Sequence, residues 1–365
     1  MYNVALLIMC ITIFLLFICY LFPIRIRVGE CTIICAIIMI SLAIISYYAE
    51  PGVSTDLYAH YYIMDCIRNG SGYTSTPLIV WEILIRVISY SRHNSLLPVC
   101  VWLMILYFII GIIKYYHTVF HNKTKNFIYF LIIFFGTCTV YYIMSGLRNS
   151  LVAVMWGYAY TKYYNSSKSK YYVISIIACF IHVYAIVPMS IVFLQELSKV
   201  ITKRMWKIVY IVVATIPVWN NILLNAFESI SIKFFNYVAF KIRLYVGWDN
   251  IDITSMIKVS IVVLILLLVM MERNNLEKKY FDFVSFFLFS NVMIGFVYPI
   301  FFTRLSYIVG VFTPGIIGAT EKKKTRILLS CIVVLCLFVI VVDVYSMIAH
   351  VNFNGIDYYD LLIGR

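Results

Sequence analysis

The sequence has few charged residues for its length. Only 12% of its 365 residues are Asp, Glu, Lys or Arg, while 63% are hydrophobic and the mean hydropathy is +0.94. A water-soluble chain could not cover so many apolar side chains with so little polar surface. Apolar stretches of about 17–25 residues recur, and this length is typical of transmembrane helices. The composition predicts an all-α, polytopic integral membrane protein.

Several motifs of well-known enzyme classes are also missing. The chain has no Walker phosphate-binding loop, no dinucleotide-binding glycine pattern and no Gly-x-Ser-x-Gly nucleophile motif. It has no Asp-rich motif that would hold a metal ion for a nucleotide-sugar donor. We therefore expect chemistry that uses no metal and no other cofactor, with substrates supplied on a lipid carrier.

The net charge of +13 has a topological explanation. Lys and Arg cluster in short connectors between apolar runs, as the positive-inside rule predicts for cytoplasmic loops. A nucleic-acid partner is therefore not expected. The connectors are residues 25–27, 114–125, 162–170, 199–207, 273–279 and 322–326.

If all six connectors lie in the cytoplasm, an even number of crossings must separate each from the next. Between the first two there are three apolar segments, and residues 77–90 form the weakest because Glu82 and Arg86 interrupt them. We predict that this segment is re-entrant or interfacial, since it is too short to span. Residues 171–198 must also cross an even number of times. We expect two short helices there, with a break near His182 and Pro188.

This parity argument gives a single transmembrane domain, 1–365, with about ten to twelve transmembrane helices and both termini outside. Exterior polar residues then concentrate in the loops 49–76 and 225–255, and the tail 352–365 is expected beside them. A GT-C-like architecture is compatible with this layout.

Arg148 lies between two apolar runs, on the side opposite the basic connectors. A cation in such a place is costly unless water or an anion meets it. Two structural explanations remain open: snorkelling to lipid headgroups, or pairing with an acidic side chain. Arg304 repeats the pattern at the start of another apolar run. Together the exterior cations predict a polyanionic ligand such as a lipid diphosphate, because guanidinium groups bind phosphate through two hydrogen bonds. The candidate binding residues are Arg148, Arg304, Lys241, Arg243 and Arg86, with Tyr245 beside them.

The first exterior loop predicts a helix over about residues 56–68. Asp56 favours the first turn, and His60 would lie on the same face, four residues later. Tyr58 and Tyr62 would line adjacent faces, where aromatic rings could stack on sugars. The alternative is an interfacial helix whose tyrosines belong to an aromatic belt.

His182 interrupts an apolar stretch at the expected helix break. One interpretation is a core histidine that is hydrogen-bonded to a neighbouring helix, and the other is a functional residue. With Asp56 and Glu82 it completes the set of candidate catalytic acids and bases.

Three short segments resemble the EpsG/Wzy group of polysaccharide polymerases. They are Ser-Gly-Leu-Arg-Asn-Ser-Leu-Val-Ala (145–153), Phe-Ile-His-Val-Tyr-Ala (180–185) and Thr-Arg-Leu-Ser-Tyr (303–307). An aspartate followed by tyrosines after the second crossing completes the ordered set, which spans about residues 45–320. The resemblance implies an integral-membrane glycosyltransferase that polymerises O-antigen, capsule or exopolysaccharide repeat units on undecaprenyl diphosphate.

Carried over by motif, the family's arginines fall on Arg148 and Arg304, its Phe-x-His element on Phe180 and His182, and its loop aspartate on Asp56. One departure is that Thr76-Pro77 stands where relatives often have Glu-Pro, which leaves open whether Glu82 acts as a base.

The resulting hypothesis is a polymerase of lipopolysaccharide-type glycans in a bacterial inner membrane, with its active site facing the periplasm. Its expected partners are an undecaprenyl-diphosphate-linked oligosaccharide, membrane lipid and a chain-length regulator protein. The alternatives are a flippase for lipid-linked oligosaccharides and another periplasm-facing transferase, such as a ligase.

Overall fold

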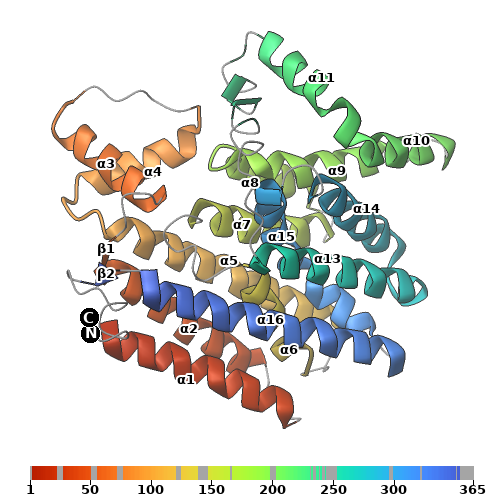
Figure 1. Ribbon diagram of the computed structural model, residues 1–365, viewed down its shortest axis with the longest axis horizontal. Helices are drawn as coiled ribbons and strands as arrows, with labels where there is room; N and C mark the ends of the chain where they lie inside the picture. Colours follow the sequence, from red (N-terminus) through yellow and green to blue (C-terminus); the bar gives the residue numbers. More distant parts are fainter. Residues whose placement is uncertain are drawn as a thin grey trace.

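Helices make up nearly all of the chain that the computed structural model describes (Figure 1). This confirms the prediction of an all-α polytopic membrane protein. The structure describes residues 2–22, 28–50, 56–71, 77–120, 125–138, 147–164, 167–197, 203–230, 232, 236–237, 239–240, 243, 253–295, 299–320, 323–350 and 352–353.

The elements follow one another with short connections. The helices are α1 (Tyr2–Leu21), α2 (Val28–Tyr48), α3 (Asp56–Arg68), α4 (Ile79–Ser89), α5 (Leu96–Phe120), α6 (Lys125–Thr137), α7 (Leu147–Tyr164), α8 (Lys168–Cys179), α9 (Ile186–Leu197), α10 (Lys203–Ala214), α11 (Ile216–Ser229), α13 (Ile253–Met271), α14 (Lys278–Gly295), α15 (Pro299–Ala319) and α16 (Lys323–His350). Two 3-10 turns, η2 (Val183–Ala185) and η3 (Arg273–Asn275), and two strands, β1 (Ala49–Glu50) and β2 (Asn352–Phe353), complete the set.

Four helices in the described residues are long and apolar enough to cross a membrane. Three shorter apolar helices accompany them, and the total of ten to twelve crossings stays a prediction. The four are Val4–Leu21, Val28–Tyr48, Leu96–Thr118 and Lys324–Tyr345, and the shorter ones are Ile128–Thr137, Val183–Leu194 and Met256–Met271.

Aromatic side chains fill the centre of the bundle around α7. Trp156 and Tyr160 stack on one another and contact Phe283 of α14 and Phe312 of α15, with ring centroids 4.6–5.4 Å apart. Inside a membrane such packing, rather than exclusion from water, holds helices together. The centre of the bundle therefore fixes α7 relative to α14 and α15.

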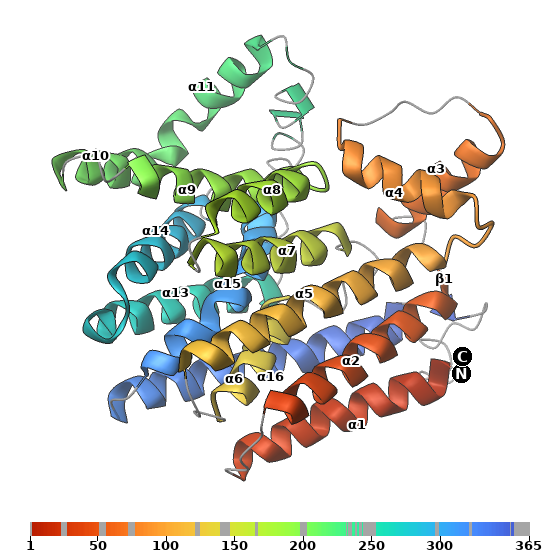
Figure 2. The same ribbon diagram turned by 180° about the vertical axis from the view of Figure 1, so that it is seen from behind.

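The end of α2 meets the start of α5, where the Trp102 Nε1–H donates to Ser46 Oγ at 3.1 Å. β1 follows α2 and pairs antiparallel with β2, which follows α16. The start of the tail therefore lies beside the first exterior loop, as expected. Both chain termini lie near this strand pair, and α3 and α4 lie beyond the start of α5 (Figure 2). We call this side of the molecule, where α7 also begins, the Arg148 end.

Residues 77–90 form a short amphipathic helix, α4. Its 11 residues extend only about 16 Å, against about 30 Å for a bilayer core. Ile79, Ile83 and Val87 are exposed along one face, while Trp81 and Ile85 are buried on the other. The prediction that this segment does not cross is therefore confirmed by its length.

Residues 171–198 form the predicted pair of short helices. α8 ends at Cys179, the chain turns through 180–182, and α9 begins at Ile186 with Pro188 in its first turn. The Lys168 Nζ lies 2.7 Å from Glu196 Oε2, so the start of α8 and the end of α9 are side by side. The two helices form a hairpin whose tip carries His182.

Residues 206–224, expected as one crossing, contain two helices instead. α10 ends at Ala214 and α11 begins at Ile216. Pro217 follows at once, and a proline lacks the N–H that a continuous helix would need there.

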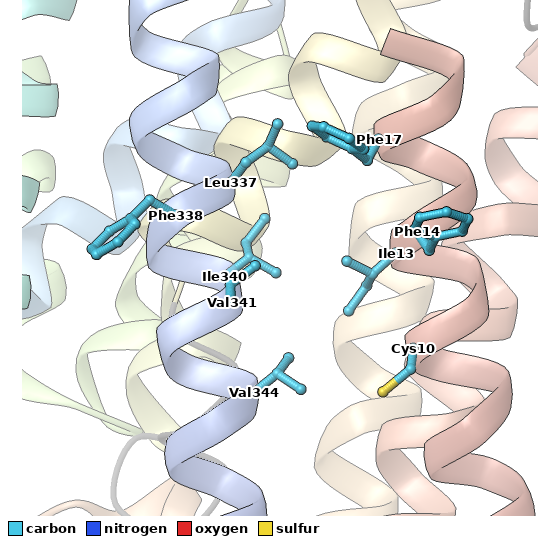
Figure 3. Close-up of a pocket in the computed structure, with 9 residues that line it drawn as sticks. All are labelled: Cys10, Ile13, Phe14, Phe17, Leu337, Phe338, Ile340, Val341 and Val344. Carbon is cyan, nitrogen blue, oxygen red and sulfur yellow. The ribbon is translucent and has the colours of Figure 1, made fainter. Parts of the chain in front are cut away.

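An apolar groove of about 460 Å³ lies between α1 and α16 (Figure 3). Side chains from both helices face one another across it, and Cys10 is its most polar residue. A surface of this kind suits lipid chains but offers no group for acid-base or phosphate chemistry.

Candidate functional site

The structure holds Arg148 between a carboxylate and an aromatic ring. Its Nη2 lies 3.8 Å from Asp56 Oδ2, and its Cζ lies 5.7 Å from the centroid of the Trp81 ring. The Arg148 side chain is 14% exposed and that of Asp56 is 44% exposed. The pairing with an acidic residue is thus present, and lipid headgroups are not needed to explain the arginine.

Arg148 is the second residue of α7, where the helix dipole is positive. The first turn of α7 contains no acidic residue that would offset this charge. The free N–H groups of a helix start and a guanidinium group both attract anions. Asp56 neutralises the arginine only partly, because the two groups are too far apart for a direct hydrogen bond. The start of α7 is therefore suited to binding a phosphate.

Asp56 opens α3, where a carboxylate stabilises the first turn. His60 lies one turn later and is buried against Trp81, with ring centroids 5.1 Å apart. Trp81 thus connects α3, α4 and α7 at one point. Tyr58 and Tyr62 are exposed on the outer side of α3, so their role in sugar binding stays a prediction.

A second set of contacts fixes α3 against the turn before α5. Asn94 accepts a hydrogen bond from the guanidinium of Arg68 and donates to Asp65 Oδ1 at 3.2 Å. Arg68 and Asp65 also pair with each other. These contacts hold α3, and with it Asp56, over the start of α7.

The tip of the α8–α9 hairpin contacts both α4 and α7. The Phe180 carbonyl accepts the backbone N–H of Trp81 at 3.4 Å, and the Tyr184 hydroxyl donates to the Asn149 carbonyl. The hairpin therefore brings His182 to the same end of the bundle as Arg148.

His182 is buried, and its ring orientation is fixed locally. Its Nδ1 accepts the backbone N–H of Tyr184 at 3.3 Å. In the neutral ring the proton must then be on Nε2, which becomes a donor. This arrangement suits stabilisation of an anion better than removal of a proton.

Arg304 lies in the second turn of α15, and its side chain lies outside the described residues. Its depth follows from the backbone, because a Cβ added at Gly157 of α7 would lie 1.9 Å from Val311 Cγ1 of α15. Arg148 precedes Gly157 by nine residues and Arg304 precedes Val311 by seven. At 1.5 Å per residue the two arginine positions differ in depth by about 3 Å.

Two other candidate cations are engaged by neighbouring acids. Arg86 pairs with Glu82 at 2.7 Å along α4, and Arg243 pairs with Glu228 at 2.6 Å. The hydrogen bonds from Arg243 hold the pKa of Glu228 below its usual value. The structure thus does not bring Glu82, Arg86 or Arg243 into contact with Arg148.

Two predicted residues and two missed ones complete the comparison. Lys241 and Tyr245 lie outside the described residues. Sequence reasoning missed Trp81 and Tyr184, although Tyr184 stands inside a quoted motif and Trp81 is next to Glu82. In the described part of the chain, no group of three His, Cys, Asp or Glu residues is arranged to hold a metal ion.

A comparison with protein families finds that the EpsG family model matches residues 32–358. The chain belongs to the EpsG family. This confirms the resemblance, and the match includes Asp56, Trp81, Arg148, His182 and Arg304. An EpsG-family protein with these apolar helices is a multi-pass membrane protein with a polysaccharide polymerase type of role. No curated protein and no solved structure matches the chain significantly.

Proposed function

We propose that the protein is a glycosyltransferase that polymerises lipid-linked repeat units. It would transfer the growing glycan from undecaprenyl diphosphate to an incoming repeat unit on the periplasmic face of a bacterial inner membrane. The observation that carries the proposal is the partly buried Arg148 at the start of α7, which lies beside Asp56 and Trp81 in an EpsG-family chain.

The donor diphosphate is placed at the start of α7. When the bond between the anomeric carbon and the diphosphate breaks, negative charge grows on the departing phosphate oxygens. A preorganised guanidinium group stabilises that charge more in the transition state than in the ground state. Arg148 supplies this group, and Arg304 lies at a similar depth on the adjacent α15.

Asp56 is the best-placed base for the acceptor. Its carboxylate is part-exposed, and among the three candidate bases it is the one that pairs with Arg148. Glu82 is paired with Arg86, and His182 presents Nε2–H as a donor. In the reaction the acceptor hydroxyl oxygen bonds to the anomeric carbon, its proton moves to Asp56, and undecaprenyl diphosphate leaves with the bonding electron pair.

The same reasoning defines the partners. The substrate is an undecaprenyl-diphosphate-linked oligosaccharide, and a chain-length regulator protein would limit the number of transfers. The free energy for each step comes from the diphosphate bond, so no nucleotide sugar is needed at this stage.

The experiment is an extension assay with purified protein and lipid-linked repeat units, without nucleotide sugar. The wild-type protein should give a ladder of products. Arg148→Ala should lower turnover on the order of 100-fold, because it removes the charge that stabilises the leaving group.

Arg273→Ala is the matched control. Arg273 also lies over an aromatic ring, with Cζ 5.4 Å from the Phe281 centroid, but on α13–α14 at the other end of the bundle. It should extend chains normally. Normal ladders from Arg148→Ala, or movement of substrate across vesicles without any extension, would contradict the proposal and the latter would indicate a flippase.

A further inference from the structure

Two charged side chains are buried inside the bundle, outside the site described above. Lys258 of α13 is 3% exposed and Asp343 of α16 is 4% exposed. α13 and α16 pack directly against one another. Ionisable groups inside a membrane bundle are costly and are usually tied to function. Neither residue has a role in the transfer reaction as proposed.

Both charges lie close to the end of α6. Each acts electrostatically on the Cys138 thiol, and Lys258 also acts on Cys336 of α16. α6 and α16 are in close contact here, because a Cβ added at Gly136 would lie 2.5 Å from Cys336 Cβ. The ends of α6, α13 and α16 therefore meet at one buried polar cluster.

This cluster is connected to the start of α7. The Cys138 thiol donates to Ser150 Oγ at 3.2 Å, and Ser150 lies two residues after Arg148. On the other side of α7, the Tyr184 hydroxyl holds the Asn149 carbonyl. The first turn of α7 is thus fixed from two directions, by the hairpin tip and by the buried cluster.

We propose that Lys258 and Asp343 are a positioning pair that holds the start of α7, and through it Arg148, in the geometry that binds the substrate diphosphate. This inference rests on the proposed function. The pair acts through Cys138 and Ser150 and does not touch the substrate. Opposite charges buried together favour one arrangement of the helices over alternatives, which apolar packing alone would distinguish less sharply.

The test replaces both charges at once. Lys258→Met together with Asp343→Leu leaves no uncompensated charge, and such replacements often preserve stability. The purified double variant should unfold near the wild-type temperature in detergent. Its turnover should nevertheless fall on the order of 100-fold, because small displacements of a catalytic group have effects of this size. Its affinity for farnesyl diphosphate, a short isoprenyl diphosphate, should fall as well.

A second measurement needs no substrate. Labelling of Cys138 by N-ethylmaleimide, followed by peptide mass spectrometry, reports whether the contact with Ser150 is intact. Labelling should rise in the double variant. Lys258→Arg, which keeps the charge, should stay close to the wild type in both labelling and affinity.

The outcomes separate this inference from the proposed function. A stable double variant with wild-type labelling and wild-type affinity would overturn the positioning role. Ser150→Ala breaks the connection with both charges in place, so unchanged affinity there would overturn it even if the double variant did not fold. Increased Cys138 labelling in a protein whose wild type binds no farnesyl diphosphate would support the pair and reject the donor chemistry.

Discussion

At the scale of single residues, the site depends on how Trp81 holds Arg148. The guanidinium lies over the indole ring, and His60 packs against that ring from α3. A cation over an aromatic face gains about 0.5–2 kcal/mol, depending on how well it is shielded from water. The ring also limits the orientations of the arginine before substrate arrives.

Trp81→Leu should therefore weaken binding of farnesyl diphosphate by roughly 3- to 10-fold, since the arginine loses its platform. Trp81→Phe keeps an aromatic face and should lose less. Titration calorimetry or a fluorescence competition assay would measure the difference. Equal affinities for the Leu and Phe variants would show that the ring face does not contribute.

The identity of the base is a second question at this scale. Asp56→Asn keeps the shape of the side chain but cannot take a proton, so turnover should fall by about 100- to 10,000-fold. Glu82→Gln should have a much smaller effect, because Glu82 is paired with Arg86 on α4. Single-turnover rates with saturating donor would compare the two. A larger loss from Glu82→Gln would transfer the role of base to that residue.

Sequence reasoning found Arg148, Asp56 and His182 because charge is conspicuous among apolar residues. It could not find Trp81, since one tryptophan in an amphipathic helix looks like any other buried aromatic residue. Nor could it show that Arg86 and Arg243 face acids of their own. Those partners depend on side-chain directions that the sequence does not fix.

At the scale of elements, the close contact between α7 and α15 sets the relative depth of Arg148 and Arg304. Only a residue without a side chain fits at the crossing, where a Cβ on Gly157 would lie 1.9 Å from Val311 Cγ1. The two helices therefore depend on one glycine for their separation.

Gly157→Ala should destabilise the protein by about 1–3 kcal/mol, because the added methyl group forces the helices apart. Turnover should fall with it, since the start of α7 moves relative to α15. Adding Val311→Ala removes the obstructing methyl groups and should restore part of both quantities. Thermal unfolding in detergent and the extension assay measure them. Failure of the second change to restore anything would place the strain elsewhere.

Element boundaries show what charge parity can and cannot predict. The α8–α9 hairpin was predicted because two basic connectors on one side require an even number of crossings. The break between α10 and α11 carries no such constraint, since either one helix or two would satisfy the count. The pairing of β1 with β2 joins segments about 300 residues apart, and four residues in extended conformation leave no periodic pattern.

At the scale of the whole molecule, polar groups concentrate at one end of an apolar bundle. Asp56, Arg148 and His182 come from α3, α7 and the hairpin tip, all at the Arg148 end, and the Lys258–Asp343 cluster adjoins the same end. The groove between α1 and α16 is apolar by contrast. This asymmetry fits a reaction at one membrane face better than passage through the full depth of the membrane.

The orientation of that face is the last prediction. The Arg148 end should face the periplasm, because the basic connectors lie at the other end. Asn69 is exposed at the end of α3, and Asn274 is exposed in η3 between α13 and α14. In a background with Cys66→Ser, a membrane-impermeant maleimide should label Asn69→Cys in cells whose outer membrane alone is permeabilised. Asn274→Cys should react only after the inner membrane is opened. The reverse pattern would place Arg148 in the cytoplasm, where undecaprenyl-linked units are assembled before export, and the polymerase proposal would fail with it.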